Sequence, residues 1–153
     1  MWSLQSVAQL PWDLALRLVV AALLGALVGA EREYSGHAAG LRTNILVAVG
    51  ACLLTILSIY GFPNDGAQGG RDPGRVAAQI VSGIGFLGAG AVFRDEDRVR
   101  GLTTAATVWL VAAIGMAVGV GAGFLAALTT VFTLVVLIVL APLSAALARR
   151  GRD

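Results

Sequence analysis

The chain has 153 residues, of which 58% are hydrophobic and only 13% carry a charge, with a formal net charge of +2. A soluble domain has about 25% charged residues, so this chain lacks the charge that a water-facing surface needs. Its hydrophobicity excludes a disordered protein, and its single cysteine, Cys52, excludes an intrachain disulfide scaffold. An integral membrane protein, surrounded by membrane lipid, remains.

Apolar stretches separated by short charged clusters predict five transmembrane helices, and therefore an all-α, polytopic fold. A transmembrane helix needs roughly 20 mostly apolar residues. In chain order, the predicted spans are residues 14–30, 43–62, 76–93, 102–123 and 124–148. The expected organisation is an N-terminal tail, a transmembrane domain and a basic cytoplasmic tail, at residues 1–13, 14–148 and 149–153.

The last two spans are separated by a turn rather than by charge, because residues 101–148 contain no Asp, Glu, Lys or Arg. A single helix of that length would be about 72 Å long, more than a bilayer can cover. Gly119, Gly121 and Gly123 mark the expected turn. Pro142 is expected to kink or end the last helix.

The arginines predict the orientation, since all basic residues are Arg and none is Lys. With five spans, the connections after the first and third spans lie on the same side as the C-terminus. Eight of the 11 basic residues fall on that side: Arg32, Arg42, Arg94, Arg98, Arg100, Arg149, Arg150 and Arg152. The positive-inside rule then places the N-terminus outside and the C-terminus in the cytoplasm.

Small residues at four-residue spacing predict close helix packing, because they allow backbones to approach in lipid. The glycines expected to do so are Gly25, Gly29, Gly83, Gly85, Gly88, Gly90, Gly115 and Gly119. They could pack within one bundle or form a seam between two chains. Five short helices enclose little volume, so we expect a homodimer. The last span, rich in large branched residues, is expected to face lipid or lie at the periphery.

Catalytic residues are scarce. His37 is expected in a solvated loop and Cys52 in a packing position, and neither has a visible catalytic or metal-binding partner. The glycine pattern at 83–88 resembles a dinucleotide fingerprint, but it lies inside an apolar span without a preceding strand. We therefore expect no enzymatic activity, no cofactor, no metal site and no nucleic-acid partner.

Polar residues within the spans are more informative, because burying them in a membrane is expensive. The set comprises Asn44, Thr55, Gln79, Ser82, Thr103, Thr104 and Thr107. They could make interhelical hydrogen bonds or line a polar pathway. No span has a carboxylate at its middle, which argues against a cation passage.

Carboxylates gather at the cytoplasmic ends of the spans. The sequence at 95–97 predicts a solvated hairpin turn, with a divalent-cation site as the alternative. Glu31 and Glu33 flank Arg32, and we hypothesise that they pair with Arg42 to fix the corner between the first two spans.

Four segments closely resemble the MgtC/SapB family of bacterial inner-membrane proteins. They are GAEREY at 29–34, AGLRTN at 39–44, RVAAQIVSGIGFLGAG at 75–90 and VRGLTTAA at 99–106. The long third segment is the most specific. The polar and glycine positions carried over from these segments are Glu31, Arg32, Glu33, Arg42, Thr43, Asn44, Gln79, Ser82, Gly83, Arg100, Thr103 and Thr104.

The resemblance implies a five-span inner-membrane domain associated with growth at low magnesium and, in pathogens, with survival inside macrophages. It also implies a membrane partner, since virulence members are described as modulators of the ATP synthase. Those members carry an additional C-terminal cytoplasmic domain with an ACT-like fold. This chain is expected to lack that domain, as a short, membrane-only member or as a truncated form.

Two functions follow as alternatives. The first is a non-enzymatic membrane regulator or adaptor that packs against itself or another complex. The second is a transporter or channel for Mg²⁺, another cation or a small solute, through a dimer. They differ in whether Asn44, Gln79, Ser82 and Thr103 converge on a water-accessible cavity.

Overall fold

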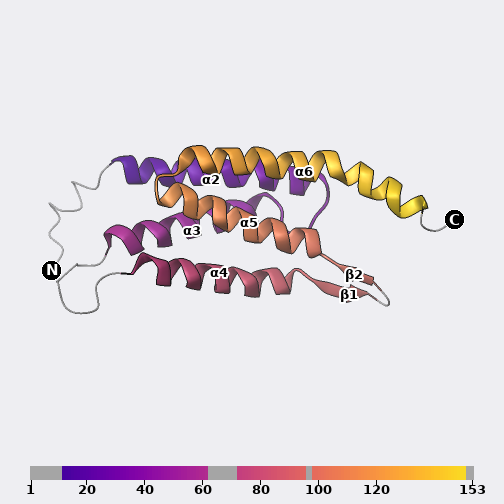
Figure 1. Ribbon diagram of the computed structural model, residues 1–153, viewed down its shortest axis with the longest axis horizontal. Coiled ribbons are helices and arrows are strands. Elements are labelled where there is room, and N and C mark those ends of the chain that lie inside the picture. Colours follow the sequence, from indigo (N-terminus) through magenta and orange to yellow (C-terminus); the bar gives the residue numbers. More distant parts are fainter. Residues whose placement is uncertain (1–11, 62–71, 96–97, 151–153) are drawn as a thin grey trace.

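The computed structural model describes residues 12–61, 72–95 and 98–150, which form helices and one short hairpin (Figure 1). The elements are α2 (Trp12–Tyr34), α3 (Leu41–Tyr60), α4 (Pro73–Gly90), β1 (Phe93–Asp95), β2 (Arg98–Arg100), α5 (Leu102–Gly119) and α6 (Gly123–Arg150). Most of the predicted N-terminal tail and the end of the predicted basic tail lie outside the described residues. The predicted helical fold is confirmed, with the two short strands β1 and β2 as an addition.

Each predicted span corresponds to one helix. Among the described residues, four helices are long and apolar enough to cross a membrane: α2, α3, α5 and α6 as far as Ala141. The helix α4 is not among them, because Arg75, Gln79 and several glycines lower its hydropathy. The count of five spans therefore stays a prediction.

Local sequence explains where α4 begins and where α5 ends. Asp72 caps α4, since its Oδ1 accepts a hydrogen bond of 2.9 Å from the backbone N–H of Gly74, and Pro73 occupies the first helical position. In the turn between α5 and α6, Gly121 has a φ of 88°, which glycine adopts without steric cost. The predicted turn between the last two helices is therefore confirmed.

The helix α6 does not end at Pro142 but continues to Arg150. Its last turns change direction and extend past the ends of the other helices (Figure 1). A proline inside a helix removes one backbone hydrogen bond and favours such a bend. Of the two predicted effects of Pro142, the kink agrees with the structure and the helix end is wrong.

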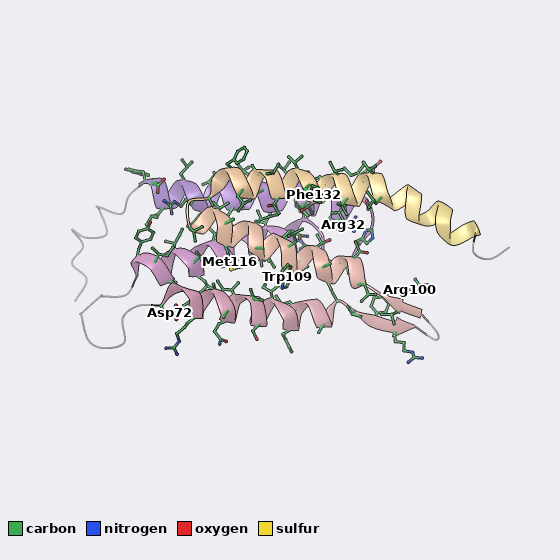
Figure 2. All side chains as sticks on the ribbon, viewed as in Figure 1. Arg32, Asp72, Arg100, Trp109, Met116 and Phe132 are labelled. Atoms are coloured by element: carbon green, nitrogen blue, oxygen red, sulfur yellow. The ribbon has the colours of Figure 1, made fainter. Side chains whose placement is uncertain are left out.

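The helices α2, α3 and α5 form the centre of the molecule. The most extensive helix contacts are those of α3 with α2 and with α5. The helix α4 packs mainly on α5, whereas α6 packs on α5 and α2, so these two helices lie on opposite sides (Figure 1). As predicted, α6 is peripheral, and its Phe132 points outward with 69% of its surface exposed (Figure 2).

Glycines set the spacing of the central helices, because each occupies a place where a methyl group would collide with α3. A Cβ on Gly25 of α2 would lie 2.8 Å from Ala48 Cβ, and one on Gly115 of α5 would strike the Ala48 carbonyl oxygen. One turn further along, a Cβ on Gly119 would lie 2.9 Å from the Cys52 carbonyl oxygen. Ala48 is thus held between two glycines on neighbouring helices.

The glycines of α4 behave differently. A Cβ on Gly88 would make ordinary contact with Ala105 Cβ at 3.6 Å. A Cβ on Gly83, Gly85 or Gly90 would have no neighbour within 4 Å among the described residues. The packing expected at these three glycines is therefore not found within a single chain, because only one face of α4 meets α5.

Arg17 connects helix ends at the opposite pole from the hairpin. Its Nη1 donates a 2.8 Å hydrogen bond to the carbonyl oxygen of Gly119, the last residue of α5. Its Nη2 lies 2.7 Å from Asp13 Oδ2. The guanidinium thereby satisfies a carbonyl group that the end of a helix leaves without an intrahelical partner.

A glycine-to-alanine pair tests the central packing. We expect Gly115→Ala to destabilise the protein by about 1–3 kcal/mol, because the new methyl meets backbone atoms of Ala48. Gly50→Ala is the matched control, since a Cβ there has no neighbour within 4 Å and alanine favours a helix by roughly 0.5–1 kcal/mol. Thermal unfolding in detergent measures both. Equal stability of the two variants would contradict the packing described.

Candidate functional site

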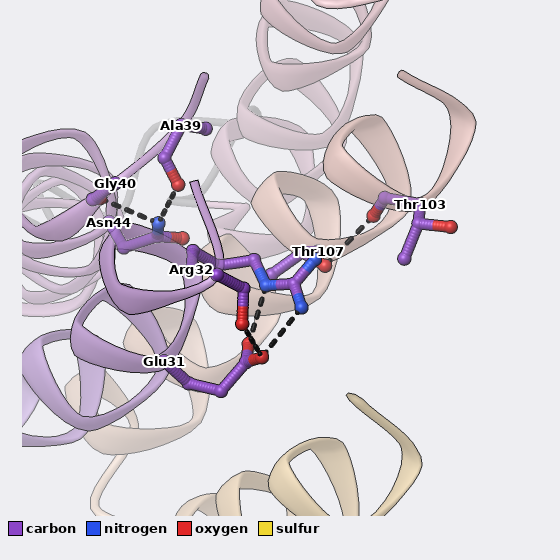
Figure 3. A network of polar contacts seen from close by, with 8 residues as sticks. Glu31, Arg32, Ala39, Gly40, Asn44, Thr103 and Thr107 are labelled. Carbon is purple, nitrogen blue, oxygen red and sulfur yellow. Dashed lines mark hydrogen bonds and ion pairs between the residues drawn. The ribbon is translucent and has the colours of Figure 1, made fainter. Parts of the chain in front are cut away.

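A cluster of polar side chains lies where α2 ends and where α3 and α5 begin (Figure 3). This is the end of the helices nearest the β1–β2 hairpin (Figure 1). Three of the predicted site residues take part with buried or partly buried side chains, Arg32, Glu31 and Asn44, and Thr104 is buried near the start of α5.

Glu31 and Arg32 form a buried ion pair. Arg32 Nε lies 2.5 Å from Glu31 Oε2, and Arg32 Nη2 donates to Glu31 Oε1 at 2.8 Å. Only 4% of the Arg32 side chain and 12% of the Glu31 side chain are exposed. Two parallel hydrogen bonds of this kind fix the orientation of both groups. The hypothesis that Glu31 pairs with Arg42 is therefore wrong.

Glu33 does not pair with Arg42 either, so the predicted pairing is wrong for both glutamates. It bonds instead to the backbone at the start of α3. Its Oε2 accepts a 2.8 Å hydrogen bond from the backbone N–H of Leu41, the first residue of α3. The residue before Leu41 is Gly40, which has no side chain to cap the helix. The carboxylate supplies the missing cap from the preceding helix and fixes the corner between α2 and α3.

Asn44 is fully buried in the first turn of α3. Its Nδ2 donates to the carbonyl oxygens of Ala39 and Gly40, each at 2.8 Å. Its Oδ1 has no hydrogen-bond partner among the described residues. The amide thus holds the connection before α3 in place while one buried acceptor stays unpaired, at a cost of roughly 1–3 kcal/mol.

The threonines of α5 divide between the interior and the surface. Thr104 and Thr107 are buried, and Thr107 Oγ1 donates to the Thr103 carbonyl oxygen at 2.8 Å. The side chain of Thr103 itself is exposed. Thr55 on α3 makes the same type of bond, to the Ala51 carbonyl oxygen. The hydroxyl groups of Thr55 and Thr107 are therefore satisfied within their own helix and not by a neighbouring helix.

Other predicted site residues lie apart from the cluster. Gln79 and Ser82 are exposed on α4, and Arg42 and Thr43 are exposed at the start of α3. Arg100 lies on the hairpin (Figure 2). The four residues expected to converge in a transporter, namely Asn44, Gln79, Ser82 and Thr103, therefore do not meet within one chain.

Ser35 belongs to the cluster but was not among the predicted site residues. Its hydroxyl donates to Glu31 Oε1 at 2.9 Å. The signal in the sequence is the four-residue spacing, which places positions 31 and 35 on the same face of a helix.

The segment around 95–97 forms a hairpin, as predicted. The antiparallel register pairs Phe93 with Arg100, Arg94 with Val99 and Asp95 with Arg98. Residues 96–97 lie outside the described residues, so the alternative of a divalent-cation site stays a prediction. In the rest of the described chain, no three His, Cys, Asp or Glu residues gather as metal ligands could.

Charge neutralisation in the buried pair provides a test of the cluster. We expect Glu31→Gln to destabilise the protein by about 3 kcal/mol, because it leaves the Arg32 charge buried and unpaired. Arg42→Gln, at an exposed position, should change stability by less than about 0.5 kcal/mol. Adding Arg32→Met to Glu31→Gln should recover part of the loss. Denaturant unfolding in detergent measures these differences, and equal effects of Glu31→Gln and Arg42→Gln would rule out the pair.

Comparison with known proteins places this sequence in a family. The sequence pattern of the MgtC family matches residues 18–146. The chain is 54% identical over 106 residues to "Protein MgtC" of Salmonella typhimurium, which covers 69% of this chain and 43% of the relative. It is 51% identical over 126 residues to "Protein MgtC" of Brucella abortus, which covers 82% of this chain and 50% of the relative.

The chain thus spans about half the length of the curated relatives it matches. No solved structure matches the chain. The family match covers most of the sequence and includes the four helices that are apolar enough to cross a membrane. The chain therefore belongs to the MgtC family and is a multi-pass membrane protein.

Proposed function

We propose that this chain is a non-enzymatic regulator or adaptor of the bacterial inner membrane, which acts by packing against another copy or another membrane complex. The family resemblance links this role to growth at low magnesium and suggests the membrane ATP synthase as a partner. The competing function is transport of Mg²⁺ or another small solute. The placement of the polar side chains favours the regulator.

One observation supports the regulator most strongly: the buried polar groups are used within the fold. Arg32 is paired with Glu31, and the Asn44 amide nitrogen bonds to backbone carbonyls. Gln79 and Ser82 are exposed on α4, and of the four residues expected to converge only Gln79 lines the apolar hollow between α3 and α4. A transport passage needs polar groups that face a common cavity, which these groups do not share.

The proposal includes five membrane crossings, with α4 as the third. The end of α3 and the start of α5 lie at opposite ends of the molecule, so α4 carries the chain across (Figure 1). The connection after α2, the hairpin and the end of α6 lie together at the other pole from the start of α2 (Figure 1). Since this pole holds most of the arginines, we assign it to the cytoplasm and the N-terminus to the outside.

A homodimer is part of the same proposal. Ala78, Ser82, Gly85 and Ala89 recur at intervals of three or four residues on α4, and all four are exposed. A helix face of small residues allows a second helix to approach closely in a membrane. By contrast, the exposed residues of α6 are mostly large, which suits contact with lipid. We therefore place the dimer seam on α4.

A flux assay separates regulator from transporter. Purified protein is reconstituted into liposomes that enclose a magnesium-sensitive dye. We expect Mg²⁺ entry equal to that of empty liposomes, with no change in Gln79→Leu, because no shared polar cavity connects the two sides. Entry well above that of empty liposomes, abolished by Gln79→Leu, would overturn the regulator proposal.

Cross-linking in native membranes tests the dimer seam. In a Cys52→Ala background, Ser82→Cys should form a disulfide-linked dimer under mild oxidation, because the two α4 helices would meet there. Val131→Cys, at an exposed position of α6, is the matched control and should remain monomeric. Only monomer from Ser82→Cys at every expression level, or equal dimer from both variants, would exclude the α4 seam.

A further inference from the structure

An apolar groove runs between α3 and α4. It has a volume of about 470 Å³ and is walled by Leu46 and Leu54 on one side and by Ile80 and Leu87 on the other. Gly50 of α3 also lines it, and a Cβ there would have no neighbour within 4 Å. The two helices therefore leave a mainly aliphatic hollow between them, with Gln79 as its one polar lining side chain.

The groove continues towards the arginine-rich pole. A second hollow of about 430 Å³ shares Leu87 with the groove and extends to Phe86, Gly90 and Thr43. A third hollow, of about 230 Å³, shares Ala38 and Thr43 with the second. The shared residues make one path from the apolar middle of α4 to the start of α3.

The end of this path is polar. Glu33, His37, Arg42 and Thr43 line the third hollow, together with the backbone around Gly40. The hollow thus holds both a guanidinium group and a carboxylate. Glu33 uses Oε2 for the hydrogen bond to Leu41, but its negative charge remains at the pocket.

We propose that this groove binds one glycerophospholipid with a primary-amine headgroup, of the phosphatidylethanolamine type. The acyl chain lies between α3 and α4, the phosphate lies against Arg42 and Thr43, and the ammonium group lies against Glu33. Guanidinium and hydroxyl groups are strong donors to phosphate oxygens. Basic pockets between membrane helices bind lipid headgroups in the same way.

The dimensions favour a lipid over a protein helix. Hollows of about 470 and 430 Å³ fall in the range of roughly 300–1,000 Å³ that is typical of small-ligand pockets. Carbonyl groups and charges at the polar end also match a headgroup better than an apolar helix.

The proposed lipid site goes beyond the regulator role and requires neither a dimer nor a partner protein. Its acyl-chain part uses the face of α4 that carries Ile80 and Gly83, whereas the proposed dimer seam uses Ser82 and Gly85, and the two surfaces share only Ala89. The two proposals can therefore fail separately.

Native mass spectrometry of the full chain tests the site. Purified protein is stripped of lipid and incubated with phosphatidylethanolamine, phosphatidylglycerol or phosphatidylcholine of the same acyl chains. We expect one retained lipid per chain, with phosphatidylethanolamine retained best. Gly83→Leu should lower retention at least tenfold, because its side chain fills the groove where a Cβ now meets nothing within 4 Å.

Gly85→Leu is the matched control, since position 85 is equally open but does not line the groove. It should keep the lipid even if it weakens the dimer. At the polar end, Arg42→Gln should reduce retention of every phospholipid about tenfold, the loss expected for one charge-assisted hydrogen bond. Arg75→Gln, an exposed arginine at the other end of α4, should not.

Glu33→Gln tests the headgroup assignment. Glutamine can still accept the hydrogen bond from Leu41, so the corner should remain folded while the preference for phosphatidylethanolamine over phosphatidylglycerol disappears. The proposal is overturned if Gly83→Leu and Gly85→Leu retain lipid equally, or if the wild type shows no headgroup preference. Capture of a polypeptide in place of lipid by photocross-linking from α3 and α4 would overturn it as well.

Discussion

The structure depends on the close packing of α3 against glycines of the two helices beside it, α2 and α5. Gly25 on α2 and Gly115 on α5 both meet Ala48 of α3, the first at its Cβ and the second at its carbonyl group. In a membrane, apolar side chains gain little by leaving lipid, so close backbone approach and packing must hold helices together. A methyl group at either glycine would push a whole helix outward. The three central helices therefore stay at one spacing, and the polar cluster at their end is built on that spacing.

Two consequences follow for the polar residues. Because α2 and α3 are held close, Glu33 reaches Leu41, and Asn44 lies buried against the connection that precedes α3. Most residues of α4 remain exposed beside the three central helices. The result is a sealed core with an exposed helix beside it, which suits a protein that works through its surfaces. The lipid groove lies between the sealed part and that helix.

Much of the fold could be predicted from the positions of charge. The gap between Arg100 and Arg149 predicted a turn near Gly121, and the structure has it there. Spacing alone could not distinguish glycines that pack from those that do not. Gly25 and Gly85 both recur with small neighbours, yet only Gly25 meets a neighbouring helix in the single chain, since that depends on which way each helix faces. Likewise, Glu31 pairs with its neighbour Arg32 and not with Arg42, because the pairing depends on side-chain conformations that cannot be read from the sequence.

Water access to the core tests the sealed arrangement most directly. In a Cys52→Ala background, Thr107→Cys replaces a buried side chain and Ser35→Cys replaces an exposed one at the same pole. Each variant is treated in native membranes with a small water-soluble thiol reagent. We expect rapid labelling of Ser35→Cys and none of Thr107→Cys. Labelling of Thr107→Cys at a comparable rate would show that water reaches the centre of the bundle, which would contradict a sealed core and favour a passage.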